Sequence, residues 1–172
     1  MLRRLSAVLL GSAILCTPAA PLRAQAALSV SGGLAAPVSD LGDVADLGYN
    51  VAAGLNFGGT VLPIGLRFEG ALNGFGLKNS SENVRILNAT ANAVVNFSQK
   101  SDSPYLIGGL GIYNTKFSDF DNSDNGAGVN LGGGLRFPVG TLNTFFEARY
   151  HAILGERNRG MQFIPITFGV VF

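Results

Sequence analysis

The stretch Phe163-Ile-Pro-Ile-Thr-Phe-Gly-Val-Val-Phe172 decides the fold, because apolar residues occupy every second position in it. These residues are Ile164, Ile166, Phe168, Val170 and Phe172. Alternation with a period of two predicts a β-strand with one apolar face. An apolar edge strand promotes aggregation in water, unless it closes a barrel and turns that face to lipid. We therefore expect this stretch to be the closing strand of a transmembrane β-barrel.

Seven further segments alternate in a similar way and are separated by turn residues. They cover residues 28–36, 49–57, 64–75, 84–97, 105–117, 129–137 and 144–152. Around residue 67, for example, apolar Leu66 and Phe68 alternate with charged Arg67 and Glu69. In the Gly-rich segment 105–117 the pattern does not distinguish the two faces. The sequence thus predicts an all-β protein, a closed antiparallel eight-stranded up-and-down transmembrane β-barrel.

The connectors between these segments fall into two groups. The longer or more polar connectors are 40–48, 76–83, 118–128 and 153–160. The shorter connectors, richer in turn residues, are 58–63, 98–104 and 138–143. Bacterial outer-membrane barrels have an even number of strands, long outer loops and short periplasmic turns. The two groups therefore fit eight strands with both ends of the barrel domain in the periplasm.

The N-terminal segment has the features of a secretory signal peptide. Arg3 and Arg4 precede an apolar run that ends at Leu15, and small residues follow. This run is too short to cross a membrane as a helix. We expect cleavage after Ala26, with cleavage after Ala24 as the alternative, so that residues 27–172 form the barrel domain.

Composition limits the classes of function. Removal of residues 1–26 takes away three of the 12 basic residues and none of the 11 acidic ones, which leaves a formal charge of −2. No basic patch remains, so nucleic acid is not an expected partner. The single cysteine, Cys16, lies in the apolar run, so no disulfide is expected in the barrel. Only 13% of the chain is charged, against about 25% in soluble proteins, which fits strands that face lipid.

The polar residues in the middle of the strands indicate that the polar faces point inward. They are mostly Asn and Gly rather than Lys, and small side chains suit the crowded lumen of an eight-stranded barrel. Charges of both signs also occur there, namely Arg67, Glu69, Arg136, Glu147 and Arg149. Enclosed charges need partners, so we expect these five residues to form a charge network in the lumen. The alternative is a set of ion pairs on the surface of a soluble sheet.

Aromatic residues near the strand ends are candidates for two interfacial girdles. They are Tyr49, Phe57, Phe75, Phe97, Tyr105, Phe117, Phe137 and Phe172. The alternative for this set is a conventional aromatic core.

Three stretches carry a resemblance to a known family: Pro104-Tyr-Leu-Ile-Gly-Gly-Leu-Gly111, Phe146-Glu-Ala-Arg-Tyr-His151 and Ile164-Pro-Ile-Thr-Phe-Gly-Val-Val-Phe172. With them, the chain resembles the small outer-membrane β-barrel domain family, OmpA- and OmpX-like in architecture. The resemblance implies a monomer in the bacterial outer membrane, surrounded by its lipid. It also implies insertion by the outer-membrane barrel assembly machinery, which would read Phe168, Val170 and Phe172 in the last strand.

Few residues suggest chemistry. Some lipid A deacylase barrels resemble this fold and use a His-x-Ser pattern, but here Ile153 follows the only histidine, His151, at that spacing. The loop around Asp121 resembles a calcium loop, although Gly132 stands where the last ligand, a glutamate, belongs. Weak Ca²⁺ binding by this loop, through Asp119, Asp121 and Asp124, remains open.

The run Gly132-Gly-Gly134 does not stand between a strand and a helix, as a phosphate-binding loop would. Strand glycines that allow close packing explain it better.

We therefore expect an outer-membrane protein with a structural or surface-interaction role, executed by its outer loops, without catalysis and without a cofactor. The sequence does not identify a partner of these loops. Two alternatives from other classes stay open. One is a secreted soluble lipocalin-like barrel that binds an apolar ligand. The other is a narrow pore or a lipid-modifying barrel enzyme.

Overall fold

The protein, described here by a computed structural model, is a closed barrel of eight antiparallel strands in which each strand pairs with its neighbours in the chain and β1 pairs with β8. The strands are β1 (Gln25–Val38), β2 (Gly48–Gly58), β3 (Ile64–Gly76), β4 (Asn83–Asn96), β5 (Ser103–Phe117), β6 (Ser123–Val139), β7 (Leu142–Leu154) and β8 (Gln162–Val171). The structure describes residues 25–58, 63–79, 82–98, 102–117, 123–154 and 161–172. The predicted fold class is confirmed.

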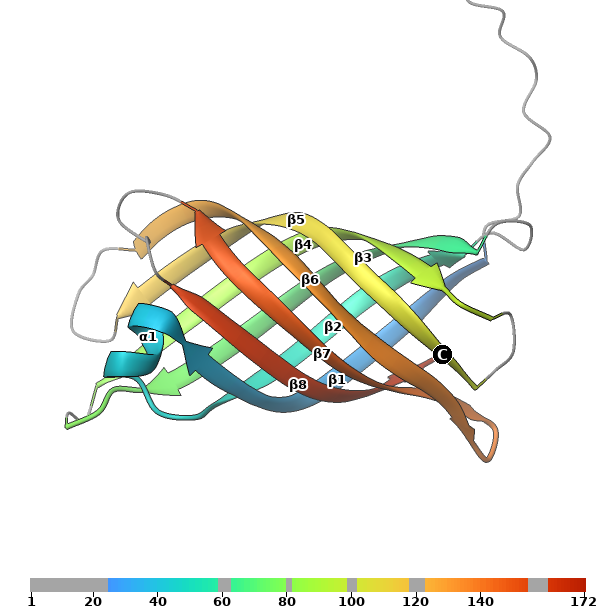
Figure 1. Ribbon diagram of the computed structural model, residues 1–172, viewed down its shortest axis with the longest axis horizontal. Coiled ribbons are helices and arrows are strands. Elements are labelled where there is room, and N and C mark those ends of the chain that lie inside the picture. The colour runs from blue at the N-terminus through green and yellow to red at the C-terminus, as the bar shows by residue number, and fades with distance from the viewer. Residues whose placement is uncertain (1–24, 59–62, 80–81, 99–101, 118–122, 155–160) are drawn as a thin grey trace, which may run out of the picture.

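The two ends of the barrel differ (Figure 1). A short helix, α1 (Ser39–Val44), follows β1 at one end, which we call the α1 end. The start of β1 and the C-terminus lie at the opposite end, which we call the terminal end. At the terminal end β6 and β7 are joined by a tight turn, in which Gly140 has a φ of +62°, a conformation that glycine adopts without strain.

Apolar side chains cover the outside of the barrel and polar ones fill its inside. In β3, Leu66 and Phe68 are 52% and 50% exposed, whereas Arg67 between them is 1% exposed. The same alternation settles β5, whose Leu106 and Leu110 point outward. A soluble barrel has the opposite orientation, with its polar face in water. The outer surface is therefore built to contact lipid.

The closing strand pairs as its sequence pattern predicts. Val170 of β8 lies opposite Val30 of β1, and Phe168 lies opposite Gly32. Beyond the end of β8, the N–H of Phe172 donates a hydrogen bond of 2.8 Å to the carbonyl oxygen of Leu28. Closure of this kind leaves no unpaired strand edge.

Most strand bounds differ from the predicted ones by up to three residues, and two differences are larger. β6 begins at Ser123, so residues 123–128, expected in a loop, pair with β5. The strand escaped detection because its first residues are small or polar, with Asn125 and Ala127 where a large outward residue would mark the alternation. The second difference is α1, which begins one residue before the expected connector 40–48 and otherwise lies in it.

The aromatic girdles are only partly as expected. Tyr49, Phe97 and Phe172 are exposed on the outside, but Phe75 and Tyr105 are each 1% exposed and lie in the lumen. The reason is strand parity, because even-numbered residues face outward in β3 and β5. Phe117 shares that inward parity in β5 and packs against a buried cluster. The expectation is therefore wrong for these three aromatic residues.

The expected signal segment lies almost entirely outside the described residues. β1 begins at Gln25, and its first two residues pair with Gly58 and Phe57 of β2. Cleavage after Ala24 would keep both pairs, whereas cleavage after Ala26 would remove them. The cleavage site stays a prediction.

Candidate functional site

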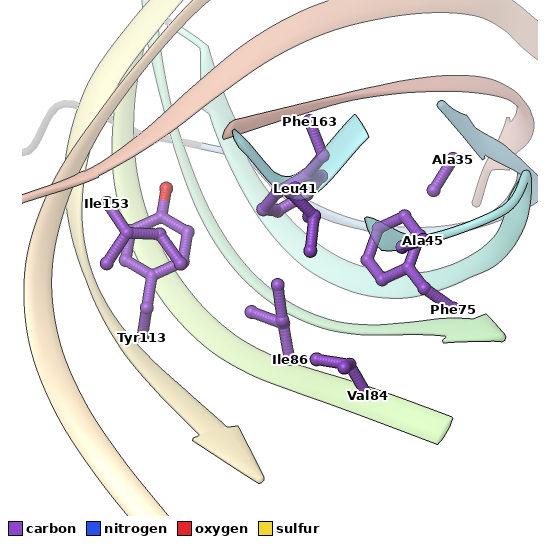
Figure 2. Close-up of a cluster of buried hydrophobic side chains, with 9 residues drawn as sticks. All are labelled: Ala35, Leu41, Ala45, Phe75, Val84, Ile86, Tyr113, Ile153 and Phe163. Atoms are coloured by element: carbon purple, nitrogen blue, oxygen red, sulfur yellow. The ribbon is translucent and has the colours of Figure 1, made fainter. Parts of the chain in front are cut away.

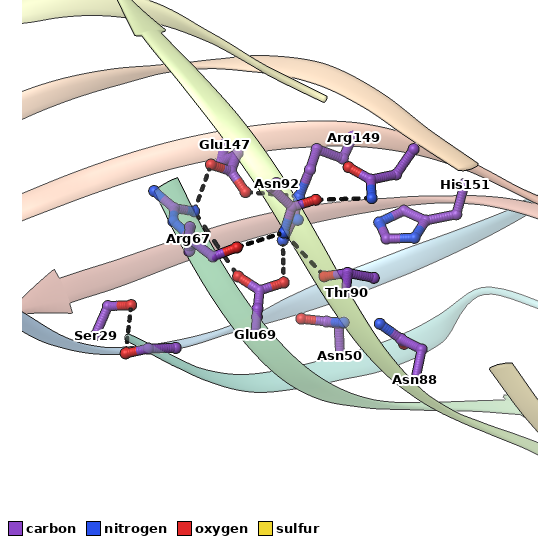
Figure 3. Close-up of polar contacts among 12 residues, drawn as sticks. Ser29, Asn50, Arg67, Glu69, Asn88, Thr90, Asn92, Glu147, Arg149 and His151 are labelled. Carbon is purple, nitrogen blue, oxygen red and sulfur yellow. Dashed lines mark hydrogen bonds and ion pairs between the residues drawn. The ribbon is translucent and has the colours of Figure 1, made fainter. Parts of the chain in front are cut away.

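Four charged side chains pair with one another in the middle of the lumen (Figure 3). Arg67 and Glu69 extend from β3, and Glu147 and Arg149 extend from β7, four strands away in the closed sheet. The two residues on each strand are two positions apart, so they share its inner face. Each side chain is at most 6% exposed. We call this set the charge ring.

Each arginine of the charge ring contacts both glutamates. Arg67 Nη1 lies 2.8 Å from Glu147 Oε2 and 3.8 Å from Glu69 Oε2. Arg149 Nε lies 2.8 Å from Glu147 Oε1, and Arg149 Nη2 donates a hydrogen bond to Glu69 Oε1. Two positive charges thus meet two negative charges, which offsets the cost of removing all four from water.

Neutral groups hold the charge ring in place. The hydroxyl of Tyr105 donates a hydrogen bond of 2.5 Å to Glu147 Oε2, and Arg67 Nε donates one of 2.8 Å to Asn56 Oδ1. The guanidinium carbon of Arg67 also lies 5.1 Å from the ring centroid of Phe145, within the range of a cation–π contact. Sequence reasoning missed Tyr105 as a partner because it placed this residue in an interfacial girdle.

Glycines of β6 provide the space that the charge ring needs. Gly132 lies opposite Arg149, and Gly134 lies opposite Glu147. A Cβ atom at Gly132 would stand 2.5 Å from Arg149 Cγ, and one at Gly134 would stand 2.5 Å from the hydroxyl oxygen of Tyr105. Both distances are too short for real contacts. These glycines therefore allow large side chains to lie flat against β6.

Asparagine side chains connect the strands around the charge ring. Asn50 Nδ2 donates to Asn73 Oδ1 at 2.7 Å, and Asn73 Nδ2 donates to Asn88 Oδ1 at 3.0 Å. On the other side, Asn130 Nδ2 donates to Asn92 Oδ1 at 2.8 Å. Short amides that are donors and acceptors at once can fill a narrow polar lumen without leaving space for a channel.

The only histidine of the sequence lies next to this layer. His151 is 2% exposed, its Nδ1 lies 2.9 Å from the hydroxyl oxygen of Tyr113, and its ring stacks on Phe163 with centroids 4.9 Å apart. Glu147, the acid on the same strand face, pairs with arginines instead of His151. These contacts pack the imidazole between aromatic rings.

An apolar cluster closes the lumen at the α1 end (Figure 2). Its buried members are Ala35, Leu41, Ala45, Phe75, Val84, Ile86, Tyr113, Ile153 and Phe163. We call this cluster the plug. Leu41 comes from α1, and Ala45 directly follows that helix. Figure 2 shows these two side chains enclosed by the strands, so the segment after β1 folds back into the barrel mouth.

Backbone contacts fix α1 against the end of β3. The N–H of Lys78 donates to the carbonyl oxygen of Val44 at 2.8 Å, and Lys78 Nζ donates to that of Gly42 at 2.6 Å. Ala45 and Leu77 form an isolated antiparallel bridge. The helix itself lacks a side-chain cap at its N-terminus, so its position depends on these contacts and on the burial of Leu41.

A second apolar cluster lies toward the terminal end. It contains Val94, Tyr105, Ile107 and Phe145, with Val171 packed against it. The lumen is thus apolar at both ends and charged in the middle. Such an interior matches the expectation that eight strands enclose side chains rather than a water-filled channel.

This architecture can be compared with known proteins. The family model for the outer membrane protein beta-barrel domain matches residues 7–171. The chain belongs to this family. The family places the protein in the bacterial outer membrane, with its apolar surface in lipid. The comparison with curated proteins found no match.

Solved structures of outer-membrane barrels share the fold. Neisserial surface protein A superposes with a TM-score of 0.68 at 18% identity, over 85% of this chain and 95% of that one. The N-terminal barrel of Pseudomonas aeruginosa OprF gives 0.52 at 14% identity, over 85% and 97%. Ail, the attachment invasion locus protein of Yersinia pestis, gives 0.51 at 19% identity, over 86% and 97%. At these identities the likeness concerns the fold alone.

The outer-membrane barrel brings together four of the five charges expected in the lumen. The fifth, Arg136 on β6, faces the lumen near the terminal end, where its guanidinium carbon lies 5.0 Å from the ring centroid of Tyr105. Within the described part of the chain, Arg136 forms no ion pair with Glu69 or Glu147. Along β6, Arg136 lies two positions beyond Gly134, the residue that stands opposite Glu147.

The residues expected to guide membrane assembly lie on the outer face. Phe168 and Phe172 are 48% and 66% exposed, and Val170 lies between them on the same face of β8. Phe168 also contacts Phe137 of β6, with ring centroids 6.1 Å apart. Their role in assembly stays a proposal.

The calcium hypothesis falls mostly outside the described residues, which include Asp124, at the start of β6, but not Asp119 or Asp121. Where the chain is described, no group of three or more metal-binding side chains occurs. The same residues contain no helix that is long and apolar enough to cross a membrane.

Proposed function

We propose that this outer-membrane barrel is a non-catalytic protein that acts structurally and through surface contacts of its outer connectors. The observation that carries this proposal is the filled lumen. The plug, the charge ring and the apolar cluster near the terminal end follow one another along the barrel axis. Such an interior argues against transport of metabolites, so the parts that remain for interaction are the lipid-facing wall and the connectors.

The proposal assigns the α1 end to the cell exterior. Outer-membrane barrels have long outer loops and short periplasmic turns. Between the observed strands, the connectors of the α1 end are 39–47, 77–82, 118–122 and 155–161, which include the two longest, and those of the terminal end are 59–63, 97–102 and 140–141. We further propose that the protein is a monomer surrounded by outer-membrane lipid. Its insertion by the barrel assembly machinery would depend on Phe168, Val170 and Phe172.

The α1 segment, residues 39–47, has a surface that suits one kind of partner. Asp40, Asp43 and Asp46 are exposed on it, and so are the apolar side chains of Val44 and Leu47, at 50% and 62%. A partner that presents basic groups beside apolar ones would complement this surface. One structure of Ail holds the heparin analogue sucrose octasulfate. A polysulfated ligand of that kind would be repelled by the three aspartates, so we propose a different partner chemistry here.

The lipid-modifying alternative is disfavoured by the surroundings of His151. Hydrolysis would need a serine-like nucleophile within hydrogen-bond reach of the imidazole, whereas the imidazole contacts the hydroxyl of Tyr113 and the ring of Phe163. The direct check is fatty acid release by the purified barrel in vesicles of outer-membrane lipid. Release that His151→Phe abolishes would overturn the non-catalytic proposal.

Topology is tested by cysteine labelling in intact cells. Asp43→Cys lies in α1, and Thr141→Cys lies in the turn between β6 and β7 at the opposite end. A membrane-impermeant maleimide should label position 43 only, and both positions after the cells are opened. Labelling of position 141 alone in intact cells would reverse the proposed orientation.

Contact through the α1 segment is tested with beads coated with polylysine. Vesicles that contain the barrel should bind these beads more strongly than vesicles that contain the triple variant Asp40→Asn, Asp43→Asn, Asp46→Asn. Equal binding would remove the α1 segment from the proposed interaction surface. The triple variant changes exposed carboxylates only, so heat-modifiable migration on gels should stay unchanged and serves as the folding control.

A further inference from the structure

The lipid-facing wall of the barrel contains a groove. It is an open depression of about 740 Å³ on the outside of β1 to β5. Its floor is formed by the small residues Ala53, Gly70, Ala89 and Ala91. Phe68 and Leu110, 50% and 68% exposed, rise beside the floor as walls.

The register of the strands builds this groove. Gly70 of β3 lies opposite Ala53 of β2 on one side and Ala89 of β4 on the other, which gives a continuous low row across three strands. Ala91 lies between Phe68 and Leu110, its partners on β3 and β5. Neighbouring strands are about 4.8 Å apart, so these two large side chains stand about 10 Å apart on either side of Ala91.

The groove extends farther in one direction along β4. Toward the terminal end, the next outward residue is the small Ala93, and the one after it, Val95, is 38% exposed. Toward the α1 end, the next outward residue is Leu87, which is 55% exposed and blocks the floor. A chain that lies in the groove therefore has a longer path and meets a smaller side chain toward the terminal end than toward the α1 end.

The position of the groove limits what can occupy it. Its floor lies in the middle of β2, β3 and β4, at the depth of the hydrocarbon core of the membrane. An occupant at that depth has to be apolar, because polar groups without partners are costly there. The closed sheet offers no strand edge to another chain. Hydrocarbon chains of the surrounding lipid are the apolar material that this wall contacts in the outer membrane.

We infer that the groove holds one acyl chain of a phospholipid from the periplasmic leaflet. The wall residues Phe68 and Leu110 hold the chain from both sides, and the low positions Ala91 and Ala93 let it run toward its head group at the terminal end. The inference uses the orientation with the terminal end in the periplasm. It does not depend on any role of the outer connectors.

Native mass spectrometry of the barrel, extracted from outer membranes in a mild detergent, tests this inference. The protein should retain one phospholipid, and Ala91→Phe, which fills the floor, should lower the retained fraction about tenfold. A tenfold change corresponds to about 1.4 kcal/mol, the contact of roughly two methylene groups. The matched control is Ala148→Phe, on the outer face of β7 away from the groove, which should keep the lipid.

Folding is checked by heat-modifiable migration, and Ala89→Leu, a smaller change on the same floor, serves as the second variant. Equal retention in the groove variants and in Ala148→Phe would overturn the inference. Retention of a glycolipid instead of a phospholipid would overturn the assignment to the periplasmic leaflet. A dimer that Ala91→Phe dissociates would show that a second copy, rather than a lipid, occupies the groove. The labelling experiment above tests the orientation separately.

Discussion

Arg67 and Glu147 are 80 positions apart in the sequence, yet Nη1 of the arginine lies 2.8 Å from Oε2 of the glutamate. On each strand the residue two positions farther along carries the opposite charge, so Arg149 and Glu69 repeat the same separation. β3 and β7 do not touch in the sheet, and their side chains meet only across the lumen. The charge ring therefore forms only when the barrel is closed, and it should stabilise the closed state.

Arg149→Ala should lower the free energy of unfolding by about 3–5 kcal/mol, the range found when one member of a buried ion pair is removed. The change leaves Glu69 without its closest cationic partner and Glu147 with Arg67 alone. Urea unfolding of the barrel in lipid vesicles, followed by its shift on unboiled gels, measures this loss.

The control for this experiment is Arg136→Ala. Arg136 faces the same lumen but contacts the ring of Tyr105 rather than a carboxylate, so its loss should cost no more than about 1 kcal/mol. Equal losses for the two variants would mean that the four ion pairs contribute nothing specific.

Gly132→Ala should destabilise the barrel by about 1–3 kcal/mol, as overpacking does in other cores. The added methyl group would stand 2.2 Å from the backbone oxygen of Ala148 and 2.5 Å from Arg149 Cγ, both on β7. Gly70→Ala is the matched control, because the nearest atom to its Cβ is 4.0 Å away. That substitution should be neutral or stabilising by up to about 1 kcal/mol. The comparison of the two unfolding curves decides whether the glycines of β6 make room for the charge ring.

The alternation of residues predicted the strands well because a barrel surrounded by lipid obeys one rule on every strand. In the middle of the strands the outward positions are mostly apolar or small, so the charged residues Arg67 and Glu69 of β3 could be predicted to face inward. The alternation cannot be recognised where the outward residues are not large and apolar. At the start of β6 the outward residues are Asn125 and Ala127, which mark no apolar face, and the glycines of β5 concealed its two faces.

The candidate site was harder to predict, since its geometry depends on the depth of each residue along the barrel axis. Composition could place Arg136 in the lumen. It could not show that Arg136 lies two positions farther along β6 than the residues opposite the charge ring. The sequence contains one sign of α1, because Leu41 and Ala45 are four positions apart, the spacing of residues on one helical face. Because α1 has only six residues and lies between two strands, this spacing alone does not predict a helix.

Leu41→Ala should loosen α1 without unfolding the barrel. Leu41 is the buried residue of a helix that begins at Ser39 with a φ of +55° and has no side-chain cap. Its contacts in the plug are therefore a main source of local stability. Hydrogen exchange measured by mass spectrometry should show faster exchange in residues 39–47, with the strands unchanged. Val44→Ala, at a residue of the same helix that is 50% exposed, should leave the exchange of that segment nearly as it is. Faster exchange throughout the barrel would mean that α1 supports the whole fold.

Phe172→Ala should lower the amount of barrel in the outer membrane while leaving the stability of the inserted protein unchanged. The side chain of Phe172 is 66% exposed, so its removal disturbs little packing, and the backbone hydrogen bond to Leu28 remains. A residue that is needed for recognition during insertion affects yield, whereas a residue that only anchors the barrel in lipid affects stability. Phe97→Ala provides the comparison, because Phe97 is 63% exposed and follows β4 at the same end of the barrel. Immunoblots of outer-membrane fractions and urea unfolding of the purified variants separate the two effects. A similar drop in yield for both variants would assign Phe172 to the aromatic girdle and not to assembly.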